Sequence, residues 1–194
     1  MRPADPAPAD DGAARHLVAG TPLPRLALSS TSGGTVNLGK RAGAAVVYVY
    51  PWTGRPGLPD PPGWDDIAGA HGSTPETVGF RDHHREFRAL EVDVFGLGTQ
   101  SGAHQRELCS RLGVPFAILS DESFAFQRAL RLPTFAVGAD SYLKRLTLFV
   151  RDGRIKHVFY PVHPPETHAR EVLDWLARSG AATYSTSRSA SSTE

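Results

Sequence analysis

The stretch Ala44-Ala-Val-Val-Tyr-Val-Tyr50 decides the fold class. An unbroken run of small, β-branched and aromatic residues is typical of a strand that is covered on both faces. Such a strand lies in the interior of a sheet that carries helices on its two sides. We therefore expect an α/β protein whose sheet is centred on residues 44–50.

Strands and helices alternate on both sides of this run. The hydrophobic periodicity predicts strands at 24–28, 35–38, 92–97, 116–119, 143–150 and 154–160, and helices at 73–90, 101–112 and 123–130. A last helix begins near Pro164-Pro165 and places Ala169, Val172, Leu173 and Leu176 on one face. The turn Arg151-Asp152-Gly153 predicts a hairpin. This order predicts a central mixed sheet flanked by helices.

Composition limits the function classes. The chain has 194 residues, one Cys and a formal net charge of +1. A single thiol excludes an internal disulfide and a zinc site of the Cys-x-x-Cys kind. The near-neutral charge argues against nucleic acid as a partner, and the apolar runs are too short to span a membrane. The first residues lack the apolar core of a signal peptide, so we expect a cytoplasmic protein.

The two ends of the chain differ from its middle. Residues 1–19 are rich in Ala, Pro and Asp and are expected to form a disordered arm. Residues 181–194 are expected to be a disordered polar tail. Residues 20–180 then form one domain, which is long enough to bury a core.

A long loop rich in Pro, Gly and Trp follows the central strand, from Pro51 to Gly72. The next residues, Ser73-Thr-Pro-Glu76, combine a hydroxyl, an early Pro and a Glu three residues later, which is a capping-box pattern. We expect Ser73 to cap this helix or to contact an anion at its N-terminus.

In this order and spacing, the segments resemble a peroxiredoxin, with a thioredoxin-like fold. The matching segments are residues 20–28, 46–51, 72–76, 94–97, 116–121 and 144–148 with Asp152-Gly153, and the resemblance covers about residues 20–178. In that family the peroxidatic Cys stands in the first turn of the helix after the loop, which is Ser73 here. The position of a resolving Cys five residues later is Val78. The resemblance also implies that Arg145 is the active-site Arg, and that Pro51 and Thr53 belong to the active-site motif.

The exchange of sulfur for oxygen changes the expected chemistry. A thiolate attacks the O–O bond of a peroxide, whereas a serine hydroxyl has no comparable anion near neutral pH and no reversible sulfenate. We therefore expect a protein that has lost thiol peroxidase chemistry and serves as a repurposed, cofactor-independent enzyme on a small organic substrate. His71 or Glu76 would act as acid or base, with Arg145 as an electrophilic clamp at Ser73. We expect the substrate to contact Pro51, Thr53, Trp52, Thr74 and Trp64, and we expect no metal.

Other interpretations stay open. The chain is alternatively a peroxide-linked oxidoreductase, either through Cys109 or because Ser73 is an engineered replacement of Cys, or else a non-catalytic pseudo-peroxidase that keeps only the fold. A lone Cys on an apolar helix face is also typical of a buried hydrophobic residue. Arg145 is either a pocket residue or a structural partner of Glu76. The partners we expect are a hydroperoxide or another small organic molecule and a second copy of the chain.

One further alternative makes Ser73 an acyl-transfer nucleophile. That reaction needs a base within hydrogen-bonding reach and a third group that orients the base. His71 and Asp66 are the candidates that the sequence offers.

Overall fold

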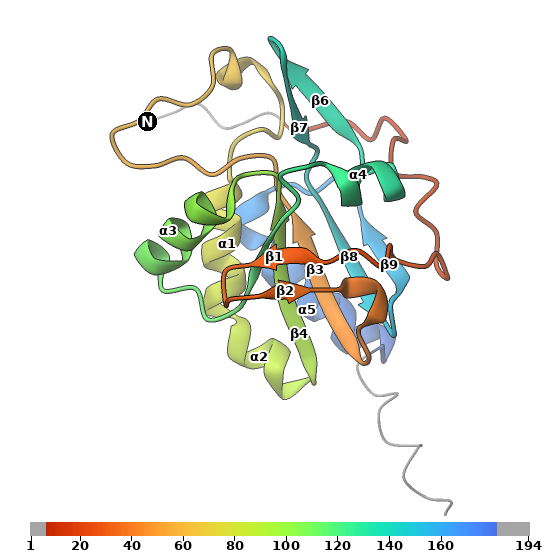
Figure 1. Cartoon of the computed structure of the whole chain (residues 1–194). Coiled ribbons are helices and arrows are strands. Elements are labelled where there is room, and N and C mark those ends of the chain that lie inside the picture. Colours follow the sequence, from red (N-terminus) through yellow and green to blue (C-terminus); the bar gives the residue numbers. More distant parts are fainter. Residues whose placement is uncertain (1–6, 182–194) are drawn as a thin grey trace, which may run out of the picture.

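The computed structural model describes residues 7–181. Its centre is a seven-stranded sheet with the strand order β2-β1-β5-β4-β3-β8-β9 (Figure 1). The strands are β1 (Leu28–Ser30), β2 (Thr35–Val36), β3 (Ala44–Val49), β4 (Val92–Gly98), β5 (Ile118–Ser120), β8 (Leu146–Arg151) and β9 (Arg154–Phe159). Strand β3 runs parallel to β4 and antiparallel to β8, so the sheet is mixed, as expected.

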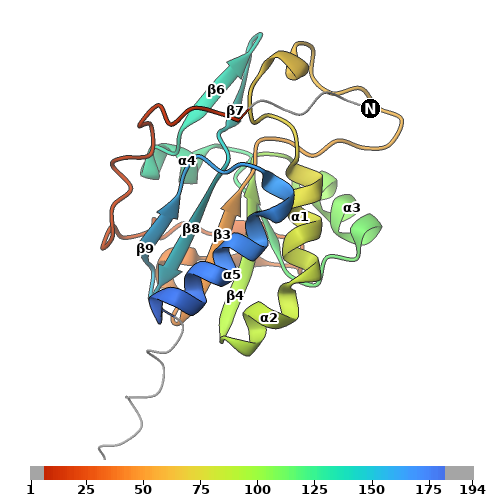
Figure 2. The ribbon, with the colours of Figure 1, turned by 180° about the vertical axis from the view of Figure 1, so that it is seen from behind.

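Helices cover both faces of the sheet. They are α1 (Ser73–Asp82), α2 (His84–Ala89), α3 (Gly102–Leu112), α4 (Ala125–Leu130) and α5 (His168–Ser179). Successive residues of β3 point to opposite faces, and every residue from Ala45 to Tyr50 is completely buried. Val46 and Tyr48 pack with residues of α1, α2, α3 and α5, while Val47 and Val49 pack with residues of α4. Figure 2 shows α1 and α5 side by side over one face. The predicted thioredoxin-like architecture is confirmed.

Two element predictions need correction. The helix expected over 73–90 is divided at His83, where φ is −93° and ψ is 3°. The His83 ring bonds the Glu86 carboxylate in the first turn of the second helix. A hairpin was missed altogether: β6 (Thr134–Val137) and β7 (Asp140–Leu143) pair around Gly138, whose φ is +60°. Strand β7 takes Leu143, so β8 begins only at Leu146.

The segment before the domain is also ordered, contrary to the expectation for residues 1–19. In residues 7–19, Ala14 and Leu17 are buried in the core between the sheet and α4. The His16 ring lies 3.0 Å from the carbonyl oxygen of Leu130. The segment has few large apolar side chains of its own, but Ala14 and Leu17 pack into a core that distant residues form. Residues 1–6 and 182–194, including almost all of the expected tail, lie outside the described residues.

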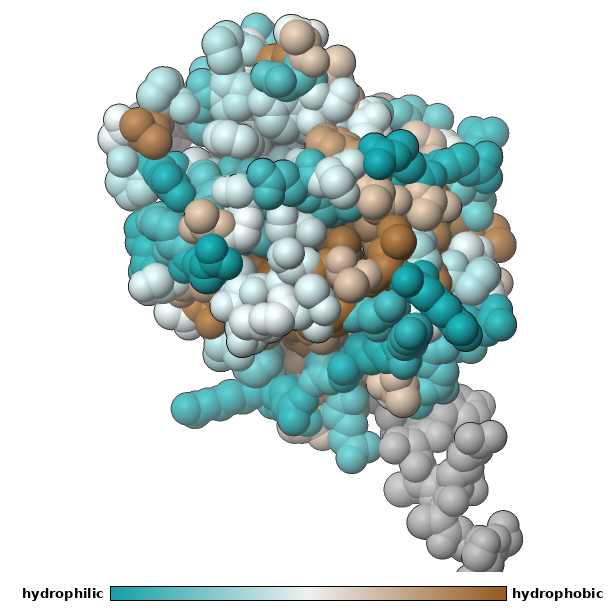
Figure 3. All heavy atoms as spheres, viewed as in Figure 1, coloured by the Kyte–Doolittle hydropathy of each residue, from teal (hydrophilic) through white to brown (hydrophobic). Residues whose placement is uncertain are grey.

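The surface is mostly polar. Figure 3 shows hydrophilic side chains spread over one face, with apolar ones scattered among them. Within residues 7–181, the large apolar side chains that are well exposed are Val18 and Leu58. No helix in this part of the chain is long and apolar enough to cross a membrane.

Candidate active site around Ser73 and Arg145

Helix α1 begins directly at the site. Its N-cap is Gly72, with φ of +97°, and no side chain caps the helix. A Cβ at position 72 would lie 2.2 Å from Cγ of Pro165, so this sharp turn requires glycine. The expected capping box is therefore absent: Ser73 is the first helical residue, and the Glu76 N–H donates to the Gly72 carbonyl oxygen at 2.9 Å.

Arg145 organises the site from the short connection between β7 and β8. Its Nη1 donates to Oε2 of Glu76, and its Nη2 donates to the Ser73 Oγ at 3.1 Å and to the His71 carbonyl oxygen at 2.8 Å. Arg145 is 5% exposed and Glu76 is 0% exposed. Both interpretations of Arg145 therefore apply, because one guanidinium binds the carboxylate and also faces Ser73.

The electrostatics of this pair come from burial. Burial raises the pKa of the Glu76 carboxyl, and the Arg145 guanidinium opposes that rise. Oε1 of Glu76 and Nε of Arg145 have no hydrogen-bond partner. The Ser73 hydroxyl thus faces a buried cation at the start of a helix. A thiol in such a place has a lowered pKa, and an oxygen atom of a ligand is stabilised there by the same charges.

Thr77 fixes the backbone under Ser73. Its hydroxyl donates to the Ser73 carbonyl oxygen at 2.9 Å and accepts a hydrogen bond from the Tyr48 hydroxyl at 3.2 Å. Burial raises the pKa of Tyr48 well above its ordinary value, so this tyrosine stays protonated and remains a donor. The first turn of α1 is therefore tied to the central strand.

A cavity of about 440 Å³ opens at Ser73. Four of the candidate residues, Trp52, Trp64, His71 and Thr74, line it. Arg55 and Asp60 of the loop and Arg111 of α3 complete this part of the lining. The two tryptophans belong to a small aromatic cluster with Phe135 and Tyr142 of the missed hairpin. The loop therefore has a core of its own, which shapes the cavity wall.

The acid or base role expected of His71 stays a prediction. The His71 Nε2 lies 2.7 Å from a carboxylate oxygen of Asp65, the neighbour of the Asp66 that the sequence suggested. The Ser73 hydroxyl accepts its hydrogen bond from Arg145, and a guanidinium stays protonated and cannot serve as a base. The structure thus gives Ser73 an anion-site environment rather than the environment of an acyl-transfer nucleophile.

Thr53 and Pro51 are buried but do not line the cavity. The backbone N–H of Thr53 and its hydroxyl both donate to Oε1 of Gln100, at 2.9 and 2.8 Å. Nε2 of His104 lies 2.9 Å from the Thr53 carbonyl oxygen. Sequence reasoning missed Gln100 and His104, because only the fold brings residues after β4 against the start of the loop. Their role is to fasten the loop to α3.

Cys109 lies on α3 in a different environment. Its thiol is half-buried against the apolar cluster that includes Leu108 and Leu112. The Sγ lies 3.6 Å from Oγ1 of Thr31. Burial raises the pKa of the Cys109 thiol, so the thiolate fraction at neutral pH is small. No cluster of metal-ligating side chains occurs within residues 7–181.

A family comparison decides where this chain belongs. The family model described as Redoxin matches residues 18–173. The chain belongs to the Redoxin family. Chloroplastic peroxiredoxin Q of Oryza sativa subsp. japonica is 26% identical over 160 residues, which are 81% of this chain and 65% of that protein, so the match spans less than two thirds of the relative. Peroxiredoxin Bcp of Escherichia coli is 27% identical over 165 residues, which cover 82% of this chain and 96% of that one.

Solved structures agree on the fold. Two Cys-to-Ser mutants of Xanthomonas campestris peroxiredoxin Q superpose with TM-scores of 0.65 and 0.66, at 23% and 22% identity. They cover 84% and 83% of this chain and 98% of their own. The resemblance to the peroxiredoxins is confirmed.

These findings correct the functional prediction. The expectation of a repurposed enzyme without peroxidase chemistry is wrong, since the relatives that match four fifths of this Redoxin chain are peroxiredoxins. A peroxide-linked oxidoreductase, the alternative, fits them better. The prediction rested on the absence of sulfur at Ser73 and Val78, although Arg145, Glu76 and the start of α1 still meet at Ser73.

Proposed function

We propose that this protein is a peroxide-linked oxidoreductase of the peroxiredoxin Q type and that Cys109 carries its redox step. The observation that carries the proposal is the intact arrangement of Arg145, Glu76 and the start of α1 inside a Redoxin chain. A buried guanidinium beside a helix start stabilises the oxygen atoms of a bound hydroperoxide.

The position of Cys109 supports its role. The two cysteines changed to serine in the Xanthomonas campestris structures are separated by the same number of residues as Ser73 and Cys109. If Ser73 stands at the first of these positions, Cys109 stands at the second. Helix α3, which carries Cys109, also supplies Arg111 to the wall of the cavity. The retained thiol therefore belongs to the element that borders the hydroperoxide site.

The proposed step is a two-electron transfer. The Cys109 thiolate attacks one oxygen of a hydroperoxide, an S–O bond forms, the O–O bond breaks, and the leaving alkoxide takes a proton and departs as an alcohol. The resulting sulfenic acid is then reduced by an external dithiol, which releases water and becomes a disulfide. Arg145 and Ser73 bind the peroxide oxygens, while Trp52 and Trp64 contact the organic part. Cys109 does not line this cavity, so the proposed step requires α3 to bring the thiol to the bound peroxide.

The test follows hydroperoxide consumption with dithiothreitol as the reductant. Hydrogen peroxide and cumene hydroperoxide are given to the unchanged protein, to Cys109→Ser and to Ser110→Ala, a matched control on the neighbouring exposed residue. We expect turnover in the unchanged protein and the control, and loss in Cys109→Ser. Without reductant, mass spectrometry is expected to find one added oxygen on Cys109. Equal consumption by the unchanged protein and Cys109→Ser contradicts the proposal.

The homodimer stays a prediction of the resemblance, and the cytoplasmic location stays a prediction of the sequence. Analytical ultracentrifugation of the purified chain tests the first, and fractionation of expressing cells tests the second. A purely monomeric sedimentation profile at micromolar concentration would contradict the dimer.

A further inference from the structure

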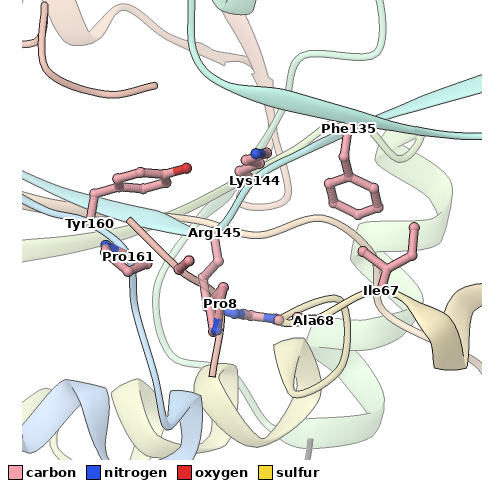
Figure 4. Close-up of a pocket in the computed structure, with 10 residues that line it drawn as sticks. Pro8, Ile67, Ala68, Phe135, Lys144, Arg145, Tyr160 and Pro161 are labelled. Carbon is pink, nitrogen blue, oxygen red and sulfur yellow. The ribbon is translucent and has the colours of Figure 1, made fainter. Parts of the chain in front are cut away.

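A second cavity lies beneath the N-terminal segment. Its volume is about 140 Å³, well above the roughly 10–15 Å³ that a single water molecule needs, so a small organic molecule fits. Figure 4 shows Tyr160 on one side of it, Ile67 and Phe135 on the other, and Lys144 and Arg145 between them. The lining therefore combines cationic and hydrogen-bonding groups with apolar side chains.

Residues 8–11 of the N-terminal segment close this cavity. Pro8 lines it and packs on Gly69, where an added Cβ would lie 3.0 Å from the Pro8 Cγ. Three residues further on, the Asp11 carboxylate accepts hydrogen bonds from Nζ of Lys144 and, at 2.7 Å, from the Tyr160 hydroxyl. The segment is thus fastened to the rim of the cavity by one carboxylate.

The charges at the rim show which chemistry the site recognises. Lys144 and Tyr160 hold the pKa of Asp11 well below its ordinary value, so Asp11 is ionised at neutral pH. Arg145 is 5% exposed, and its Nε has no hydrogen-bond partner. A lysine ammonium and a phenol hydroxyl already bind one carboxylate here, and a neighbouring guanidinium keeps unused donor capacity.

We propose that this cavity binds a small organic carboxylate that competes with Asp11. The carboxylate of the ligand pairs with Lys144 and Tyr160, and its apolar body lies against Ile67 and Phe135. Binding then displaces the Asp11 carboxylate from Lys144 and Tyr160 and loosens residues 8–11. In the protein without ligand, Asp11 competes for Lys144 and Tyr160. The apparent affinity is then the intrinsic affinity multiplied by the fraction of molecules in which these two groups are free.

Benzoate is the probe, and isothermal titration calorimetry on the full chain is the measurement, with neither peroxide nor reductant present. The result is therefore independent of Cys109 and of the proposed redox step. Asp11→Asn weakens the competitor, so benzoate is expected to bind about tenfold more tightly than to the unchanged protein. Asp174→Asn, which removes an exposed carboxylate on α5, is the matched control and is expected to leave the affinity unchanged. Lys144→Met is expected to abolish binding, and Lys156→Met to retain it.

Two further observations exclude a general loss of folding or unspecific binding. Each variant is checked by thermal unfolding, and hydrogen exchange in residues 8–11 of the unchanged protein is expected to rise on benzoate addition. Benzamide, which is neutral and of similar shape, is expected not to bind. Equal affinity for benzamide and benzoate, equal affinity of Asp11→Asn and the unchanged protein, or absence of binding to Asp11→Asn would each overturn the proposal.

Discussion

Ser73 and Cys109 divide between them what a thiol peroxidase usually combines at one atom. Ser73 has the electrostatic environment, with the Arg145 guanidinium 3.1 Å from its hydroxyl at the start of a helix, but it carries no sulfur. Cys109 has the sulfur, half-buried among apolar side chains, with the Thr31 hydroxyl as a polar neighbour. The reactivity of a thiol therefore depends on its surroundings, because they set the fraction that is present as thiolate.

The largest effect on stability is expected at Arg145, the cation beside Ser73. Arg145→Met leaves the Glu76 carboxylate buried without its cation, and we expect the free energy of unfolding to fall by about 3–5 kcal/mol. Urea denaturation measures the change. Arg128→Met is the control, because Arg128 is exposed and donates to a backbone carbonyl, and we expect a change within about 0.5 kcal/mol. A loss below about 1 kcal/mol in Arg145→Met would mean that the pair contributes little.

Moving the sulfur from position 109 to position 73 tests whether the surroundings of Ser73 make a thiol more reactive. At pH 7, the double variant Ser73→Cys with Cys109→Ser is expected to react with iodoacetamide about 100-fold faster than the unchanged protein, equivalent to about 2.7 kcal/mol. The reason is that Arg145 favours the thiolate, whereas burial raises the pKa of Cys109. A raised pKa means that the thiolate forms only at higher pH than for an ordinary cysteine, so the unchanged protein should still gain reactivity as the pH rises above 9. Coinciding pH profiles for the two proteins would contradict this account.

A smaller loss of stability is expected where Thr53 joins the loop to Gln100 and His104. Thr53→Val removes the hydroxyl that donates to the buried Gln100 amide, and we expect a loss of about 1–3 kcal/mol in urea denaturation. Thr35→Val, on the exposed edge strand β2, is the matched control and should change stability by less than about 0.5 kcal/mol. A similar effect of the two variants would show that the Thr53 contacts are not stabilising.

The smallest effect is expected at Asp65. Its side chain is 73% exposed, so its pairing with His71 is screened by solvent. Asp65→Asn should lower the free energy of unfolding by less than about 1 kcal/mol, and peroxide turnover should stay unchanged. A large loss of turnover with stability intact would instead assign His71 a role in the reaction.

Much of the fold follows from local patterns. The run from Ala44 to Tyr50 predicts the buried central strand, and the spacing of Ala169, Val172 and Leu176 predicts the buried face of α5; all of these residues are buried. Such patterns succeed because burial on one side of an element leaves a periodic record in neighbouring residues. The resemblance also singles out Ser73 and Arg145, and the structure brings both together with Glu76.

Other contacts join residues that are distant in the chain, and no local pattern predicts them. Arg145 serves Glu76 and Ser73 at once, Asp65 rather than Asp66 meets His71, and Gln100 meets Thr53, because the fold sets these distances. The N-terminal segment looks disordered from composition alone, yet Asp11 meets Lys144 across 133 positions of the chain. Composition reports what a segment can bury by itself, whereas its order here comes from partners that the rest of the fold supplies.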